Sequence, residues 1–178
     1  MRIELLDSLR ALRNEFVHGL HRQDVAGFAR RLEQLGITIT PSEVPAVIQA
    51  LSSGGGSAGL YYVPQSILEV VGKLLEGREA RVVCDPWAGL GAVIATLQEL
   101  THATKALALT QNTTEAALGK ALNPTADWHV GEPLQLLESL NEEIDVVASI
   151  LPFGLKASKP VTLAGADGIS REKTVGAA

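Results

Sequence analysis

Beyond residue 64 the sequence alternates between short apolar segments and longer segments of helical periodicity, and this alternation limits the choice of fold more than any other feature. Short apolar strands that alternate with helices form a parallel sheet covered on both faces, because each crossover helix packs back onto the sheet. The sequence therefore predicts an α/β unit with about four parallel strands. The expected strands are 81–85, 105–110, 126–130 and 144–149, and the expected helices are 65–76, 90–100, 114–122 and 133–140.

The N-terminal part of the chain has a purely helical pattern. Leucines and Phe16 recur at three- and four-residue spacing, a second helix is expected over 24–34, and a third begins at Thr40, where Glu43 completes a capping box. The Gly- and Ser-rich segment 52–58 lacks side-chain bulk and predicts a flexible linker. We therefore expect a helical domain at 1–51, a linker at 52–58 and the α/β domain at 59–178.

The composition excludes several classes of protein. The chain has 178 residues, 46% of them hydrophobic and 20% charged, which predicts a packed core rather than disorder. The single cysteine, Cys84, excludes an intrachain disulfide, and His18 and His21 lack a third ligand nearby, so no metal site is expected. No apolar run reaches the roughly 18 residues of a membrane span, and the acidic N-terminus does not fit a signal peptide. We expect a cytoplasmic protein without membrane contact.

The strongest local signal is the segment 83–91, Val-Cys-Asp-Pro-Trp-Ala-Gly-Leu-Gly, in which a strand enters a turn with two glycines and then a helix. Gly89 and Gly91 permit close approach of the backbone to a ligand, and the helix start presents free N–H groups. The segment thus predicts a carboxylate or phosphate group at the carboxyl end of the first strand. A tight turn without a ligand has the same pattern, and the segment alone leaves both interpretations open.

Two flanking segments make the pattern more specific. Residues 59–65 read Gly-Leu-Tyr-Tyr-Val-Pro-Gln, and residues 149–154 read Ser-Ile-Leu-Pro-Phe-Gly. Together with the glycine turn, in order and spacing over 59–154, they resemble the modification subunits of type I restriction enzymes and related adenine-N6 DNA methyltransferases. The resemblance implies a Rossmann-like methyltransferase sheet, S-adenosylmethionine as cofactor and DNA as substrate. Because the net charge is −5, most of the DNA contact is expected from other regions or a partner specificity subunit.

The resemblance also implies the cofactor site. It places Tyr62 and Pro64 against the methionine moiety of S-adenosylmethionine, and Asp85 with the two glycines along its amino-acid end. Glu132 stands where the family has an aspartate that accepts from the adenine amino group; a solvated residue at a helix start is an equally open interpretation. The implied cofactor-binding residues are Tyr62, Pro64, Asp85, Pro86, Gly89, Gly91, Thr110, Gln111 and Glu132.

Two positions depart from the family pattern. Thr110 stands where an acidic residue accepts both ribose hydroxyls, and losing a charge-assisted hydrogen bond of roughly 1.5–3 kcal/mol predicts at least about tenfold weaker cofactor binding. Gln111 either restores one bond or is solvated. Ile150 replaces the asparagine of the Asn-Pro-Pro-Phe loop, so that of the catalytic loop only Pro152 and Phe153 remain, the latter to stack on a flipped base.

These departures predict a methyltransferase domain for adenine N6 in DNA that is weak or inactive. The alternatives are a non-catalytic module of the same fold that serves interaction or DNA positioning, and a methyltransferase for a protein or RNA amide; a plain nucleotide-binding domain comes last.

We also expect the natural polypeptide to continue past Ala178. Only four strands are predicted, so 144–149 would leave an unpaired sheet edge. In the tail, 161–163 at best pairs locally, and Ser170 has the pattern of a helix cap.

Overall fold

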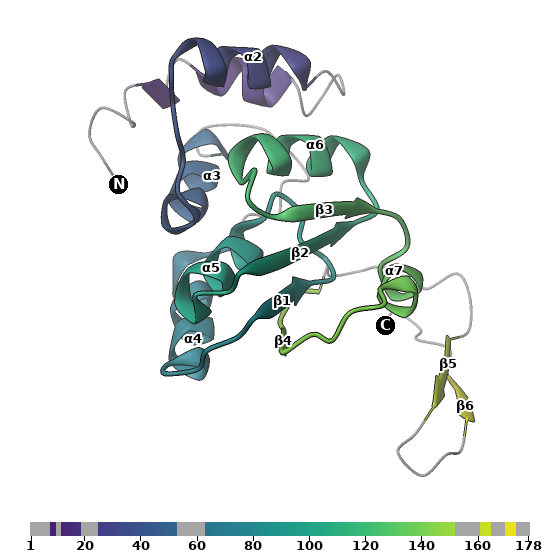
Figure 1. Cartoon of the computed structure of the whole chain (residues 1–178). Helices are drawn as coiled ribbons and strands as arrows, with labels where there is room; N and C mark the ends of the chain where they lie inside the picture. The colour runs from purple at the N-terminus through teal and green to yellow at the C-terminus, as the bar shows by residue number, and fades with distance from the viewer. Residues whose placement is uncertain are drawn as a thin grey trace.

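The fold is built on a four-stranded parallel sheet with helices on both faces (Figure 1). The computed structural model describes residues 8–9, 12–18, 25–52 and 63–151, together with the backbone of two short strands at 161–164 and 170–173. The sheet has the order β3-β2-β1-β4, with strands β1 (Val82–Asp85), β2 (Lys105–Thr110), β3 (Asp127–Val130) and β4 (Val146–Val147). The direction of the connections reverses beside β1, as in a doubly wound sheet, and the arrangement is compatible with a Rossmann-like fold.

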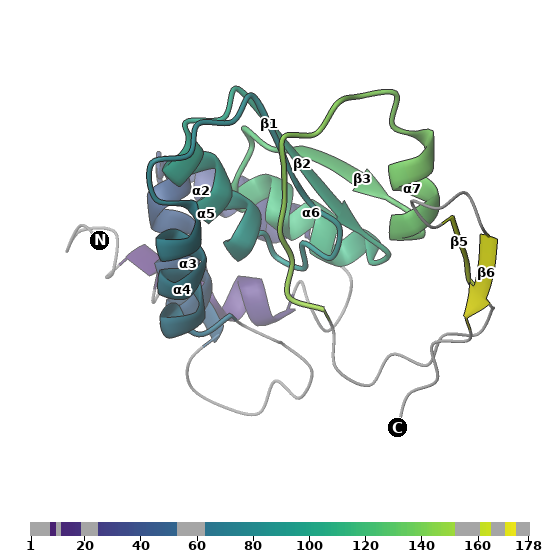
Figure 2. The same cartoon turned by 90° about the horizontal axis from the view of Figure 1, so that it is seen from below.

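Helices α4 (Gln65–Leu75) and α5 (Ala92–Thr101) lie on one side of the sheet and α7 (Pro133–Ser139) lies on the other (Figure 2). Alternate residues of the strands pack into two different hydrophobic clusters. Val83, Ala106 and Ala108 pack with α4 and α5 on one face. Val82 and Leu107 face the leucines of α7 on the other. This alternation is what a sheet buried on both faces requires, and it explains why the strands are apolar throughout. The predicted α/β class with four parallel strands is confirmed.

The N-terminal helices pack against the sheet-covering helices. The elements are helical residues 8–9 and 12–18, α2 (Ala26–Gln34), a 3-10 helix (Pro41–Glu43) and α3 (Val44–Ser52). Phe16 and Phe28 meet edge to face with 5.4 Å between ring centroids, in one cluster with Leu90 at the glycine turn and Leu118 of α6 (Thr113–Leu122). The helical region therefore supports the glycine turn from outside the sheet. Of the predicted linker at 52–58, Ser52 is instead the last residue of α3, and residues 53–58 lie outside the described residues, so the domain division stays a prediction.

Strand β4 is shorter than predicted. Only Val146 and Val147 pair with β1, where 144–149 was expected. At the start of the segment the Asp145 carboxylate accepts the N–H groups of Arg81 and Val82, each at 2.8 Å. These bonds hold the pKa of Asp145 below its ordinary value. The Asp145 N–H also donates to the Val82 carbonyl at 3.0 Å, so the side-chain hydrogen bonds add to the backbone bond at this end of the strand.

The prediction of a helix that begins at Ser170 is wrong. Strand β6 (Ser170–Lys173) pairs antiparallel with β5 (Val161–Ala164), with Val161 opposite Lys173. Pairing of 170–173 with the preceding strand outweighs the local capping signal of a serine. Local pairing of 161–163 is confirmed. The two strands form a separate sheet, and within the described residues no strand pairs with the second edge of β4.

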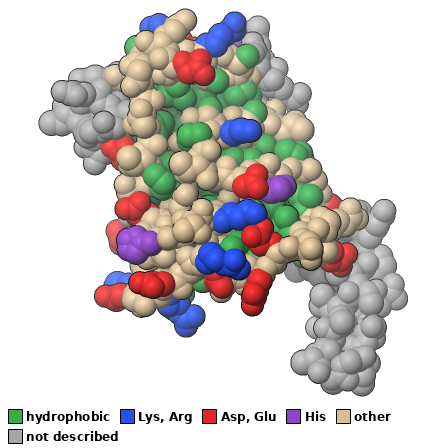
Figure 3. All heavy atoms as spheres, viewed as in Figure 1, with side chains coloured by type: hydrophobic (Ala, Val, Ile, Leu, Met, Phe, Trp, Pro, Cys, Tyr) green, Lys and Arg blue, Asp and Glu red, His purple; other side chains and the backbone are tan. Residues whose placement is uncertain are grey.

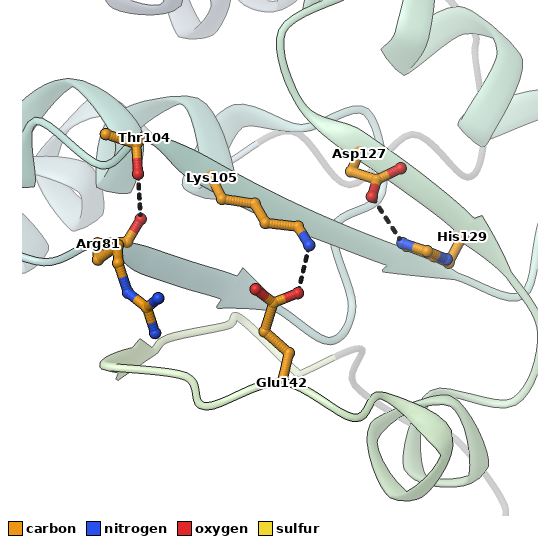
Figure 4. A network of polar contacts seen from close by, with 6 residues as sticks. All are labelled: Arg81, Thr104, Lys105, Asp127, His129 and Glu142. Carbon is orange, nitrogen blue, oxygen red and sulfur yellow. Dashed lines mark hydrogen bonds and ion pairs between the residues drawn. The ribbon is translucent and has the colours of Figure 1, made fainter.

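Charged side chains are mixed on the surface rather than segregated. On the face shown in Figure 3, Lys and Arg side chains lie among Asp and Glu side chains. At the amino end of β2, Lys105 pairs with Glu142, and on β3 His129 Nε2 lies 3.3 Å from the Asp127 carboxylate (Figure 4). In the part of the chain that the structure describes, no helix is long and apolar enough to cross a membrane.

A glycine in α6 makes room for a tryptophan of β3, and this contact predicts a stability effect. A Cβ atom at Gly119 would lie 2.1 Å from the Trp128 ring. The ring is held in place because Trp128 Nε1 donates to the Asn123 carbonyl at 3.2 Å. Gly119→Ala should lower the free energy of unfolding by about 1–3 kcal/mol through overpacking. Gly27→Ala in α2, where the added methyl meets no atom within 4 Å, should be neutral or stabilising. Thermal unfolding of both variants tests this; equal stability of the two would contradict the packing argument.

Candidate functional site

The carboxyl ends of the first three strands are joined into one edge. The Ala88 N–H of the glycine turn donates to the Leu109 carbonyl of β2 at 2.9 Å. The Gly131 N–H, just after β3, donates to the Thr110 carbonyl at 3.0 Å. The loops that follow β1, β2 and β3 therefore converge, which is where open α/β sheets bind ligands. Of the predicted cofactor residues, the structure brings together those at 85–91, 110–111 and 132.

Asp85, the last residue of β1, is buried and only partly satisfied. Its side chain is 1% exposed, and its Oδ1 accepts from the Ser149 hydroxyl at 2.5 Å and from the Trp87 N–H at 3.2 Å. Its Oδ2 has no hydrogen-bond partner among the described residues. Burial raises the pKa of Asp85 to about 7, against the opposing effect of those two hydrogen bonds. A carboxyl group in this state accepts or donates at Oδ2 near neutral pH, and such groups are concentrated at functional sites.

The two glycines of the turn differ in their surroundings. Gly89 has a φ of +52°, and a Cβ atom added there would meet nothing within 4 Å, so this position is open. Gly91, just before α5, has a φ of +95°, and an added Cβ would lie 3.0 Å from the Trp128 ring. At Gly91 both the positive φ and the contact with Trp128 favour glycine, whereas the open surroundings of Gly89 leave space for a ligand.

The Glu115 carboxylate lies at the end of β2, where Thr110 replaces the acidic residue of the family pattern. The buried Thr110 hydroxyl donates to Glu115 Oε2 at 3.0 Å. Asn112 caps α6 by accepting the N–H groups of Thr114 and Glu115, which places Glu115 in the first helical turn. Sequence reasoning missed Glu115, and the Asn-x-x-Glu spacing was the signal that could have found it. Gln111 is exposed at the same edge.

The other predicted residues have mixed placements. Glu132 begins α7, and its Oε2 accepts the Gln135 N–H at 2.9 Å, so one oxygen serves as a helix cap. Pro64 is exposed at the start of α4, and Pro86 is buried in the turn. Ile150 is half-buried and packs against the cluster under α4 and α5. Tyr62, Pro152 and Phe153 lie outside the described residues.

Two further features bear on the chemistry. Burial, followed by the charge of neighbouring Asp85, raises the pKa of the Cys84 thiol to about 12, so this cysteine is neutral and no nucleophile. A hollow of about 450 Å³ lies at the opposite, amino end of the strands, lined by Glu79, Arg81, His102 and Asp145 among others. It contains none of the predicted site residues. Within the described residues, no three His, Cys, Asp or Glu side chains gather as a metal site.

The fold and this edge define the chain as an α/β protein with a buried carboxyl group at the carboxyl end of its first strand. No protein-family model, curated protein or solved structure matches the chain.

Proposed function

We propose that the chain binds S-adenosylmethionine at the carboxyl edge of the sheet and is a methyltransferase-type domain for adenine N6 in DNA. The observation that carries this proposal is Asp85, a buried carboxyl group with one oxygen that has no partner among the described residues, at the start of the turn that contains the open Gly89. Leaving a buried polar atom unpaired is costly, and a ligand ammonium or hydroxyl that donates to Oδ2 removes that cost. The resemblance of residues 59–154 to adenine-N6 methyltransferases supports the choice of ligand.

The described residues fit this cofactor in three places. Asp85 offers an acceptor for the amino group of the methionine moiety. Glu115, bonded to Thr110, offers carboxylate oxygen near the end of β2, where ribose hydroxyls need acceptors. Glu132 retains a second oxygen beside the one that caps α7. Glu115 thus offsets the missing acid at position 110, and cofactor binding should be less impaired than the sequence alone predicts.

Methyl transfer is proposed to be slow. When bound, the cofactor supplies the methyl group, and the chain must align the adenine amino nitrogen with it. Ile150 offers no acceptor for the hydrogens of that nitrogen, and its side chain packs into the hydrophobic cluster. This packing favours a second candidate function, a non-catalytic module of the same fold that binds the cofactor or positions DNA.

The test is calorimetric titration with S-adenosylmethionine, with two glycine variants as a matched pair. Gly89→Leu should lower affinity at least about tenfold, because a side chain then fills the space left for the ligand. Gly77→Leu is the control, since Gly77 follows α4 with a φ of +72° and equally open surroundings, away from the site. Unimpaired binding by Gly89→Leu would place the pocket elsewhere, and no binding by the parent chain at any pH would overturn the proposed function.

A further inference from the structure

A single hydroxyl group connects the end of β4 to the glycine turn. Ser149 lies 64 positions after Asp85 in the sequence, yet its Oγ donates to Asp85 Oδ1 at 2.5 Å. The Trp87 N–H donates to the same Ser149 Oγ at 3.2 Å and to Asp85 Oδ1 at 3.2 Å. Three residues from two segments thus form a closed hydrogen-bonded triangle at the carboxyl ends of β1 and β4.

The triangle assigns different roles to the two carboxyl oxygens. Oδ1 accepts two hydrogen bonds and is held in place, whereas Oδ2 accepts none from the described residues. A hydroxyl that donates to a carboxylate stabilises the charged form, because the acceptor is stronger when ionised. Ser149 therefore acts against burial, which favours the neutral form of Asp85.

Ser149 provides the side-chain hydrogen bond that favours the ionised form of Asp85, and none of the other titratable groups is among the causes of the pKa shift of Asp85. The neighbouring Cys84 thiol is neutral. Lys105 and Asp145 lie at the other end of the sheet from the Asp85 carboxyl group. Lys105 is the register partner of Val82, and the Asp145 carboxylate accepts the Val82 N–H. The remaining titratable residues on the packed elements and adjoining strand ends are Glu69 and Lys73 on α4, Glu99 on α5, Glu115 and Lys120 on α6, Asp127 and His129 on β3, Glu132, and Glu138 on α7. Burial, Ser149 and Trp87 are the causes that set the ionisation of Asp85.

We propose that Ser149 is a positioning residue that holds the Asp85 carboxyl group in its ionised, ligand-accepting state and so links the end of β4 to the ligand site. This inference rests on the proposed function for the identity of the ligand, but not for the contact itself. Because Ile150 follows directly, the same hydroxyl also connects the ligand site to the segment in which the catalytic loop is predicted. Ser149 does not contact the reacting atoms in this proposal; it acts through Asp85.

The test follows the ionisation of Asp85 by carbon NMR of the labelled carboxyl group in the ligand-free chain. Ser149→Ala should raise the midpoint by about one to two pH units, the equivalent of one hydrogen bond to a charged group. Ser149→Thr, which keeps the hydroxyl, should restore the midpoint to within about half a unit. Ser139→Ala is the matched control, because that exposed hydroxyl donates only to the Leu136 carbonyl, at 2.8 Å.

Calorimetry with S-adenosylmethionine gives the second readout. At pH 7, Ser149→Ala should bind about 5- to 50-fold more weakly, and the loss should shrink as pH rises above the shifted midpoint. An unchanged NMR midpoint in Ser149→Ala, or the same shift in Ser149→Thr, would overturn the role of Ser149. Absence of cofactor binding by the parent chain would overturn the proposed function instead, while the ligand-free titration still decides the role of Ser149.

Discussion

Replacing Ile150 by Asn together with Leu151 by Pro should raise methyl transfer to adenine N6 by about 10²–10³-fold, the effect of one preorganised polar group at a reacting centre. The adenine amino nitrogen is a poor nucleophile because its lone pair is delocalised into the ring, and an amide oxygen that accepts one of its hydrogens offsets this. Ile150 provides no such oxygen. Transfer of labelled methyl groups from S-adenosylmethionine to adenine-containing DNA measures the change.

The control for this prediction is Ile150→Gln with the same Leu151→Pro. Both variants remove the same half-buried isoleucine from the hydrophobic cluster, so both should lose similar stability. Only the shorter amide places its oxygen as the family loop does. A parent chain that already transfers methyl groups as fast as the Asn variant would contradict the prediction. A folded, cofactor-binding Asn variant without activity would favour the non-catalytic module.

The affinity for S-adenosylmethionine should depend strongly on pH through Asp85. The pKa of this carboxyl is raised to about 7, so below that pH the ligand-free protein carries a proton that must leave before Oδ2 can accept from an ammonium group. Each unit below the midpoint should therefore cost about tenfold in affinity, and affinity should level off above it. Titrations between about pH 5.5 and pH 7.5, in buffers of different ionisation enthalpy, measure the slope and the released proton.

Asp85→Asn should remove this pH dependence and weaken binding while stabilising the ligand-free fold. Because folding raises the pKa of Asp85 from 3.8 to about 7, the folded protein loses stability as pH rises between these two values. The neutral amide of Asn does not ionise, so the variant should be more stable than the parent at neutral pH. Each kcal/mol gained should raise Tm by about 2–4 °C for a chain of this size. Asp127→Asn, an exposed carboxylate on β3, is the control. A parent chain whose affinity is flat over this pH range would show that Asp85 does not contact the ligand.

Local patterns in the sequence were sufficient for the helices and for the alternation of strands and helices that defines the α/β class. Each predicted helix from 65 onward lies within two residues of an observed one, because periodic apolar side chains and capping residues act over a few neighbouring positions. At Thr40 the predicted cap is present, with the Thr40 N–H donating to Glu43 at 3.1 Å. The glycine turn was likewise recognisable, since Gly89 and Gly91 adopt positive φ values that glycine favours.

The tertiary structure alone decided which residue holds the buried carboxyl group of the candidate site. Ser149 meets Asp85 across 64 positions, and no periodicity in the sequence displays that contact. Glu115, in contrast, lies only five positions after Thr110, and the capped start of α6 brings the two side chains together. The raised pKa of Asp85 follows from burial, which depends on every element packed around β1. Likewise Gly91 is constrained by Trp128, a residue of another strand, so that its role in packing is visible only when β3 is in place.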